Sequence, residues 1–184
     1  MKVKTGLLCL LSVVICGCAI WTPIKMENRR WQSGDFSAEL PTGWNRSQTP
    51  DYFLYMTRDG VGLQNIGISK EKTGKELPNT KKKISEGMLL EDVADITLEE
   101  LKLNKFYNNF ELLENKPVEL STLPAFRLAY TYTNAEFVKF KVIQYGFIHK
   151  KKYYEIHYQA TVQRNFDKYK ADFENFLSSF RIKD

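Results

Sequence analysis

In the second half of the chain, hydrophobic residues recur at every second position, which is the spacing of strands that bury one face. The two clearest series are Phe126-Leu128-Tyr130-Tyr132 and Tyr154-Ile156-Tyr158-Ala160-Val162. Between them the phase changes from Val138-Phe140-Val142 to Tyr145-Phe147, which predicts a β-bulge near Ile143. With a turn at Lys150-Lys151-Lys152, this region predicts an antiparallel meander that has one face buried.

The last apolar series has helical spacing instead. Six residues fall on one stripe of a helix: Phe166, Tyr169, Phe173, Phe176, Leu177 and Phe180. Asn165, just before them, is a residue type that caps helix N-termini, and Asp167 suits the positive end of the helix dipole. We therefore expect a C-terminal helix whose stripe packs on the sheet.

The first half contains a shorter run of strand signals. Alternation at residues 36–39 is followed by a turn with Gly43 and then by Trp44, a large apolar anchor. Strands are predicted at 52–56 and 61–68, joined by a tight hairpin at Asp59-Gly60. This half therefore opens with a second meander.

A polar stretch from Lys70 to Lys83 predicts a loop or the ragged start of a helix, and helical structure is expected between Ile84 and Phe106. Thr97 and Glu100 fit a capping box, so one interrupted helix or two short helices are both compatible with the pattern. The order of elements predicts an α+β fold, an antiparallel sheet flanked by helices.

The N-terminus has the three zones of an export signal. Lys2 and Lys4 are followed by an apolar run from Leu7 to Ile15 and by small residues. The run is shorter than the roughly 20 apolar residues that a membrane-spanning helix needs. Residues 1–17 are therefore predicted to be a signal peptide rather than a permanent span.

The signal ends in Ile15-Cys16-Gly17-Cys18, which resembles the bacterial lipobox: an aliphatic residue, a small residue, Gly or Ala, and an obligatory Cys. Ile15 and Cys16 depart from the commonest choices, whereas Gly17-Cys18 keeps the core of the motif. The resemblance implies that Cys18 receives a diacylglycerol and becomes the first residue after cleavage, often with a further acyl chain such as palmitate. An ordinary secreted protein cleaved near Cys16 or Gly17 is the alternative, and it leaves Cys18 unexplained.

Lipidation would use every cysteine, because Cys9 and Cys16 leave with the signal and Cys18 carries lipid. A disulfide, a cysteine metal site and a cysteine nucleophile are then excluded, so the fold must be stabilised by its core. Residues 18–32 have mixed charges and no sustained period, which predicts a tether between the lipid and one domain at 33–184. The domain would lie close to the membrane.

Two stretches resemble the ends of the PsbP-like domain, which the photosystem II extrinsic protein, the yeast Ran-binding protein Mog and bacterial DcrB-like lipoproteins share. They are Phe36-Ser37-Ala38-Glu39-Leu40-Pro41-Thr42-Gly43-Trp44 and, at the C-terminus, Ala160, Phe166, Phe173 and Ser178-Ser179-Phe180-Arg181. The resemblance implies an α/β/α sandwich that binds partners without catalysis. It transfers no manganese, calcium or Ran site, because no matching ligands are found.

Candidate chemistry is sparse. His149 and His157 are the only histidines, and Glu155 shares a strand face with His157. A metal-ligand or acid/base role for the Glu155/His157 pair is conceivable, but two neighbours at spacing two are common by chance, so we interpret them as a plain surface pair. Ser178 and Ser179 lack a nucleophile motif, and no phosphate-binding or dinucleotide motif is present. No metal, cofactor or enzymatic activity is therefore expected.

Charge and aromatic content leave two surfaces to consider. The formal net charge of +5 includes Lys2 and Lys4 of the signal, so the mature chain is less basic than the full sequence. A charge this small does not indicate nucleic acid as a partner. The lysine runs at 81–83 and 150–152 can contact anionic headgroups, although solubility explains them better. Five tyrosines form either a partner surface or part of the sheet lining: Tyr130, Tyr132, Tyr153, Tyr154 and Tyr158.

Together these features predict an envelope lipoprotein that is attached to the membrane through Cys18 and acts as a non-catalytic binding or assembly module for protein partners. In a Gram-negative host, Ala19 after the lipidated cysteine favours the outer membrane, facing the periplasm. A small-molecule carrier or an enzyme of unrecognised type is the alternative. A deep pocket lined by converging polar groups would favour that alternative.

Overall fold

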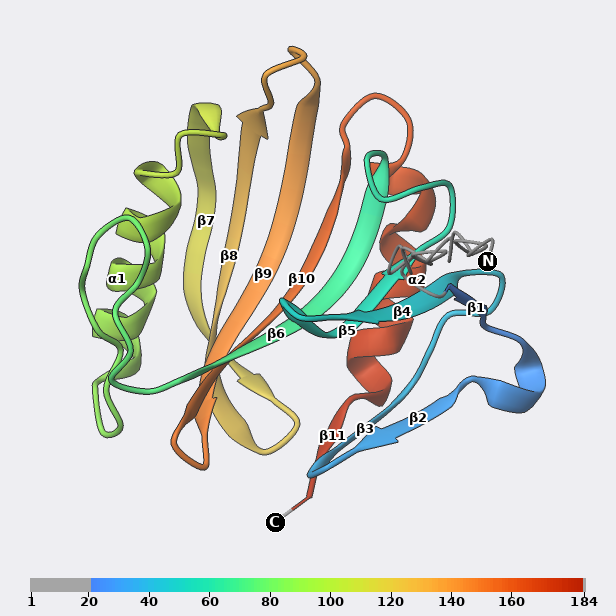
Figure 1. Ribbon diagram of the computed structural model, residues 1–184, viewed down its shortest axis with the longest axis horizontal. Helices are drawn as coiled ribbons and strands as arrows, with labels where there is room; N and C mark the ends of the chain where they lie inside the picture. Colours follow the sequence, from blue (N-terminus) through green and yellow to red (C-terminus); the bar gives the residue numbers. More distant parts are fainter. Residues whose placement is uncertain (1–20, 184) are drawn as a thin grey trace, which may run out of the picture.

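The computed structural model describes residues 21–183, which form two antiparallel sheets and two α-helices (Figure 1). The large sheet has eight strands in the order β1-β4-β5-β6-β10-β9-β8-β7, and the small one has the order β11-β3-β2. Within residues 21–183, neither helix is long and apolar enough to span a bilayer. The predicted α+β class and the antiparallel sheet are confirmed.

The strands of the large sheet are β1 (Thr22–Pro23), β4 (Asn45–Thr49), β5 (Tyr52–Thr57), β6 (Gln64–Lys72), β7 (Asn108–Leu120), β8 (Leu123–Thr133), β9 (Lys139–His149) and β10 (Lys152–Thr161). The small sheet contains β2 (Arg30–Ser33), β3 (Phe36–Glu39) and β11 (Arg181–Ile182). The helices are α1 (Leu90–Lys102), α2 (Phe166–Ser179) and a short 3₁₀ helix, η1 (Met26–Asn28). Helix α1 lies in the connection from β6, inside the sheet, to β7 at its edge.

Both faces of the large sheet are covered, whereas the meander was predicted to bury only one. On β10, Tyr154, Ile156 and Tyr158 belong to one hydrophobic core, and Tyr153 belongs to the other. The predicted bulge near Ile143 is therefore wrong. Strand β9 pairs in unbroken register with both neighbours, and its apolar residues change phase because Val142 faces one core and Ile143 the other.

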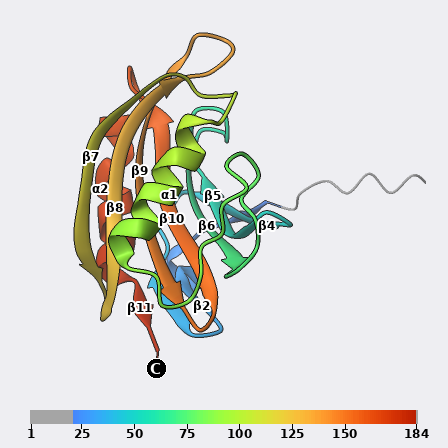
Figure 2. The same cartoon turned by 90° about the vertical axis from the view of Figure 1, so that its left-hand side faces the viewer.

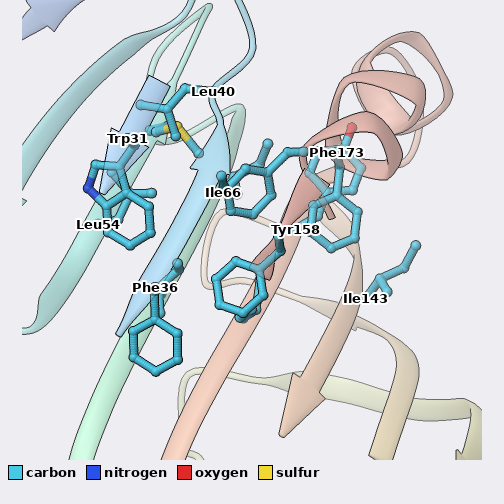
Figure 3. Packing of buried hydrophobic residues seen from close by; sticks show 14 of the residues in the cluster. Trp31, Phe36, Leu40, Leu54, Ile66, Ile143, Tyr158 and Phe173 are labelled. Carbon is cyan, nitrogen blue, oxygen red and sulfur yellow. The ribbon is translucent and has the colours of Figure 1, made fainter. Parts of the chain in front are cut away.

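Helix α2 and the small sheet cover the first face. The predicted stripe is confirmed, since Phe166, Tyr169, Phe173 and Phe176 are all buried. Figure 3 shows Phe173 against Tyr158 of β10, and their rings stack with centroids 5.3 Å apart. Phe36 of the small sheet lies on the same face and contacts Tyr154. Aromatic residues from three parts of the chain thus close this core.

Helix α1 covers part of the second face, over β7 and β8 (Figure 2). A single helix forms, so the uncertainty between one helix and two is resolved. The capping box is wrong, because Thr97 lies in the middle of the helix and its hydroxyl is 2.9 Å from the Tyr153 hydroxyl. Glu100 instead accepts hydrogen bonds from Asn79 and Thr80 of the preceding loop.

The predicted tether at 18–32 is wrong for residues 22–32, which belong to the fold. Strand β1 pairs with β4, and β2 pairs with β3. Ile24 and Trp31 are buried in the first core, which explains why this polar-looking segment is held. Residues 1–20 lie outside the described part of the chain, so the predicted signal peptide and Cys18 do as well.

Two local predictions near the start of α2 also fail. The β5–β6 connection is a longer loop than a tight hairpin at Asp59-Gly60, because β6 begins only at Gln64. Asn165 makes no side-chain cap to α2. Its amide group instead accepts a hydrogen bond from the Thr161 hydroxyl and donates one to Asp59, which ties the helix start to the β5–β6 loop.

Candidate functional site

A cleft of about 550 Å³ opens on the second face of the sheet, beside α1. Its floor includes Tyr153 and Glu155 of β10 and Ser69 of β6, and Thr97 and Glu100 of α1 form part of one wall. Further lining comes from the β4–β5 turn, the end of β6, the β6–α1 loop and α1: Pro50, Asp51, Lys70, Glu71, Lys75, Glu76, Leu77, Pro78 and Leu101. The volume lies in the range typical of small-molecule sites.

Glu155 is the central polar group of this cleft. Its Oε1 accepts hydrogen bonds from the Gln144 amide and the Tyr153 hydroxyl, both at 2.9 Å. Its Oε2 has only a longer contact, 3.5 Å from the Ser69 hydroxyl. Burial raises the pKa of the Glu155 carboxyl, and the hydrogen bonds from Tyr153 and Ser69 oppose that rise.

His157 lies two residues after Glu155 on β10 and on the same face, but the two side chains do not bond to each other. His157 Nε2 is 2.9 Å from Asn65 Oδ1, and its ring packs edge-on against Tyr52. Burial lowers the pKa of the imidazole to about 4, so the ring is neutral near pH 7. The two residues share a face, as predicted, but their description as a plain surface pair is wrong because each is partly buried and specifically hydrogen-bonded.

The five tyrosines do not form a partner surface, since all of them are buried. Tyr154 and Tyr158 belong to the core under α2. Tyr130, Tyr132 and Tyr153 face the other way, and their hydroxyls bond to Gln144, Gln159 and Glu155 respectively. These three tyrosines instead form a layer of polar contacts on the cleft-bearing face.

Four of the six lysines in the two runs bind groups of the protein itself, and Lys81 donates a hydrogen bond to the Pro78 carbonyl at 2.7 Å. Lys82 pairs with Glu99, and Lys83 lies 3.5 Å from Glu76. Lys150 pairs with Asp35 at 3.1 Å, an interaction that helps to lower the pKa of Asp35. His149 also contacts Asp35, at 3.3 Å, and packs on Phe36. These contacts favour a structural role over headgroup binding.

One end of the molecule carries a row of exposed apolar side chains, which we call the apolar rim. Its members come from four connections or their borders: Val61, Leu63, Leu103, Phe106, Phe137, Val138 and Val162. Register and hydrogen bonds bring them together, since Asn108 pairs with Thr133, Val162 bonds to Lys139, and Thr161 bonds to Leu63. In Figure 1 these connections lie along the top edge.

The Ser178 and Ser179 hydroxyls donate to carbonyls of the preceding helical turn, as ordinary helix-end serines do. Among residues 21–183, no three His, Cys, Asp or Glu side chains come close enough to hold a metal ion. The cleft can instead bind a ligand through Glu155 and the neighbouring hydroxyls.

Glu155 could be identified from the sequence, whereas its cleft and the apolar rim could not. The alternation along β10 placed Glu155 on the same face as His157 and Gln159. The cleft walls come from the β6–α1 loop and α1, and no local pattern shows where these return to the sheet. The rim residues are single apolar residues in separate connections, so their exposure is visible only in the folded chain.

No protein-family model matches this sequence, and a comparison with curated protein sequences finds no relative. Solved structures nevertheless share its fold. Cyanobacterial PsbP from Synechocystis is 15% identical, with a TM-score of 0.57, and the match covers 91% of this chain and 95% of that protein. LpqN from Mycobacterium tuberculosis is 12% identical, with a TM-score of 0.60 and coverage of 90% and 91%.

The Ran-binding protein Mog1p from Saccharomyces cerevisiae is 10% identical, with a TM-score of 0.54 and coverage of 91% and 97%. All three matches extend over about nine-tenths of this chain. The PsbP-like fold implied by the sequence motifs is therefore confirmed. At these identities the similarity establishes the fold alone.

Proposed function

We propose that this protein is a lipoprotein of the bacterial cell envelope, attached through Cys18, and that it acts as a non-catalytic binding or assembly module for a protein partner. The apolar rim is the observation that carries the proposal of a partner. Residues 1–17 then serve as the export signal, and the folded domain follows the lipidated cysteine after a few residues. In a Gram-negative host, Ala19 would direct the protein to the outer membrane.

The exposed apolar side chains of the rim do not stabilise an isolated domain. Phe137 is 89% exposed and Phe106 67% exposed, so neither stabilises the core. Phe137 also has a φ of +59°, a left-handed conformation that is unfavourable for a bulky residue. A strained, exposed aromatic residue with apolar neighbours is typical of a surface that a partner covers.

The descriptions of two proteins that share the fold are consistent with this proposal. Mog1p is a Ran-binding protein, and LpqN is involved in cell envelope biogenesis. Neither description concerns this chain, whose rim residues must be tested directly. An envelope location would be reached through Cys18, because the lipobox is the addressing signal in the sequence.

Replacing Cys18 with Ala should abolish lipid attachment, because the thiol is the only group that can receive the diacylglycerol. Cells fed with a labelled palmitate analogue should label the wild-type protein and not Cys18→Ala. The variant should also accumulate as the longer precursor, since the lipoprotein peptidase cleaves only after lipid transfer. Equal labelling and equal length of the two proteins would contradict the anchor.

A photo-crosslinking phenylalanine analogue at position 137 should capture a discrete protein in the native envelope. Leu89 provides the matched control, because it is also apolar and 70% exposed but lies at the other end of α1 from the rim. We expect the protein adduct at position 137 and not at position 89. Adducts to lipid alone at position 137, or identical adducts at both positions, would contradict a protein partner at the rim.

A small-molecule carrier remains the second candidate, and a specific observation favours it. Glu155, Tyr153, Ser69 and Thr97 all line the cleft, as a pocket with converging polar groups requires. A carrier and a partner-binding module are compatible, because the cleft does not include the rim residues.

A further inference from the structure

We propose that the cleft beside α1 binds an organic cation, a primary ammonium or a guanidinium group, with Glu155 as its counter-charge. The inference does not depend on the lipid anchor or on a partner at the rim, because it rests on the cleft alone. The same cationic group can come from a free amine or from a Lys or Arg side chain of another protein.

In the part of the chain that the structure describes, the Glu155 carboxylate has no cationic partner. Within residues 21–183 it takes part in no salt bridge, and all three of its hydrogen-bond donors are neutral. A partly buried carboxylate without a counter-charge is unfavourable, because its hydration is incomplete. A ligand cation would supply that charge, and Oε2, with its single long contact, has the capacity to accept a hydrogen bond from it.

The surroundings of Glu155 are rich in negative charge. Five carboxylates line the cleft against two lysines. Lys75 and Glu71, both lining residues, pair with each other at 2.6 Å, and Glu76 pairs with Lys83, which lies outside the lining. The Lys70 ammonium lies 4.0 Å from the centre of the Phe53 ring. Glu100 is held by the neutral donors Asn79 and Thr80. The cleft is therefore negative, in a protein whose formal net charge is +5.

The walls of the cleft combine carboxylates with apolar surface. The carboxylates do not form a metal-binding group among the described residues, which disfavours a bare ion. The lining of the same cleft also includes apolar surface from Pro50, Leu77, Pro78 and Leu101. A charged group on an alkyl chain matches this combination, because its head can reach Glu155 while its methylene groups contact the apolar wall. The volume of about 550 Å³ admits a chain of several carbon atoms.

The test is calorimetric titration of the mature protein with 1,5-diaminopentane and agmatine. The neutral comparison is 1,5-pentanediol, which has a similar length and no charge. We expect saturable one-to-one binding of at least one cation and none of the diol. Absence of saturable binding for both cations, or equal binding of the diol, would overturn the inference.

The Glu155→Gln variant isolates the charge, because its amide oxygen can still accept from Gln144 and Tyr153. We expect the dissociation constant for the cation to increase at least tenfold. Glu174→Gln is the matched control, since Glu174 is an exposed carboxylate of α2 on the opposite face. Unchanged binding in Glu155→Gln, or the same loss in Glu174→Gln, would refute the assignment.

A second variant keeps the test valid if Glu155→Gln does not fold. Glu100→Gln removes a negative charge from the wall rather than the floor, and it should weaken binding about threefold while circular dichroism stays unchanged. If binding to both Glu100→Gln and Glu155→Gln equals that of the wild type, the cleft is not a cation site.

A further titration, with blocked tripeptides, distinguishes the two sources of the cation. Tripeptides with blocked ends and a single central Lys or Arg present only the side-chain cation. Tighter binding of a tripeptide than of the free amines identifies a protein side chain as the source, and the reverse order identifies a free small molecule. Failure of every cation would leave crosslinking at Phe137 unaffected, so the two proposals can fail separately.

Discussion

Phe173→Ala should lower the free energy of unfolding by about 3–5 kcal/mol, which is a large part of a typical total of about 5–15 kcal/mol. Phe173 is 1% exposed and stacks on Tyr158, between α2 and the centre of the large sheet. Its removal leaves a cavity that neither a rigid strand nor the helix can fill. Denaturant titration of the wild type and the variant measures the difference.

Asn175→Ala is the matched control for that experiment, because Asn175 is exposed on the same helix. It should change the stability by less than about 0.5 kcal/mol. A loss below about 1 kcal/mol for Phe173→Ala would mean that α2 does not depend on its buried stripe.

Gly146→Ala should destabilise the protein by about 1–3 kcal/mol, although alanine is ordinarily the better residue within a strand. Gly146 on β9 lies directly opposite Phe126 on β8. A Cβ at position 146 would lie 2.2 Å from Cζ of the Phe126 ring. Phe126 is itself buried, so the ring can move only by disturbing the core under α1. The steric cost should therefore exceed the gain in backbone entropy.

A double-mutant cycle separates these contributions. Phe126→Leu removes the clashing Cζ, so Gly146→Ala should cost at least about 1 kcal/mol less in that background. Gly62→Ala is the control, because a Cβ there meets no atom within 4 Å. An equal cost of Gly146→Ala in both backgrounds would show that the Phe126 ring is not the cause.

Elements whose large apolar residues lie on one face were the most predictable from the sequence. The stripe of α2 and the alternation on β8 and β10 appear in the structure, because the other face of each strand carries mainly small or polar residues, such as Ala129 on β8 and Glu155 on β10. Strand β9 differs, because large apolar residues lie on both of its faces. Val142 and Ile143 are both buried on opposite faces, so apolar residues lose their period and imitate a bulge.

The parts of the structure that could not be predicted from the sequence depend on tertiary contacts. Strand β1 has two residues, too few for a pattern, and its segment is held by burial of Ile24. The environment of Glu155 depends on α1, which is distant in sequence and places Thr97 and Glu100 on the cleft wall. Residue type and strand parity located the carboxylate, whereas its burial and missing counter-charge arise only after the chain has folded.

We propose that lipid on Cys18 attaches the domain to the envelope. Mass spectrometry of the N-terminal peptide of the protein, purified from its native membrane, detects that lipid. We expect a chain that begins at Cys18 and carries the mass of a diacylglycerol, with or without one more acyl chain. An unmodified Cys18, or a mature chain that begins at another residue, would contradict it.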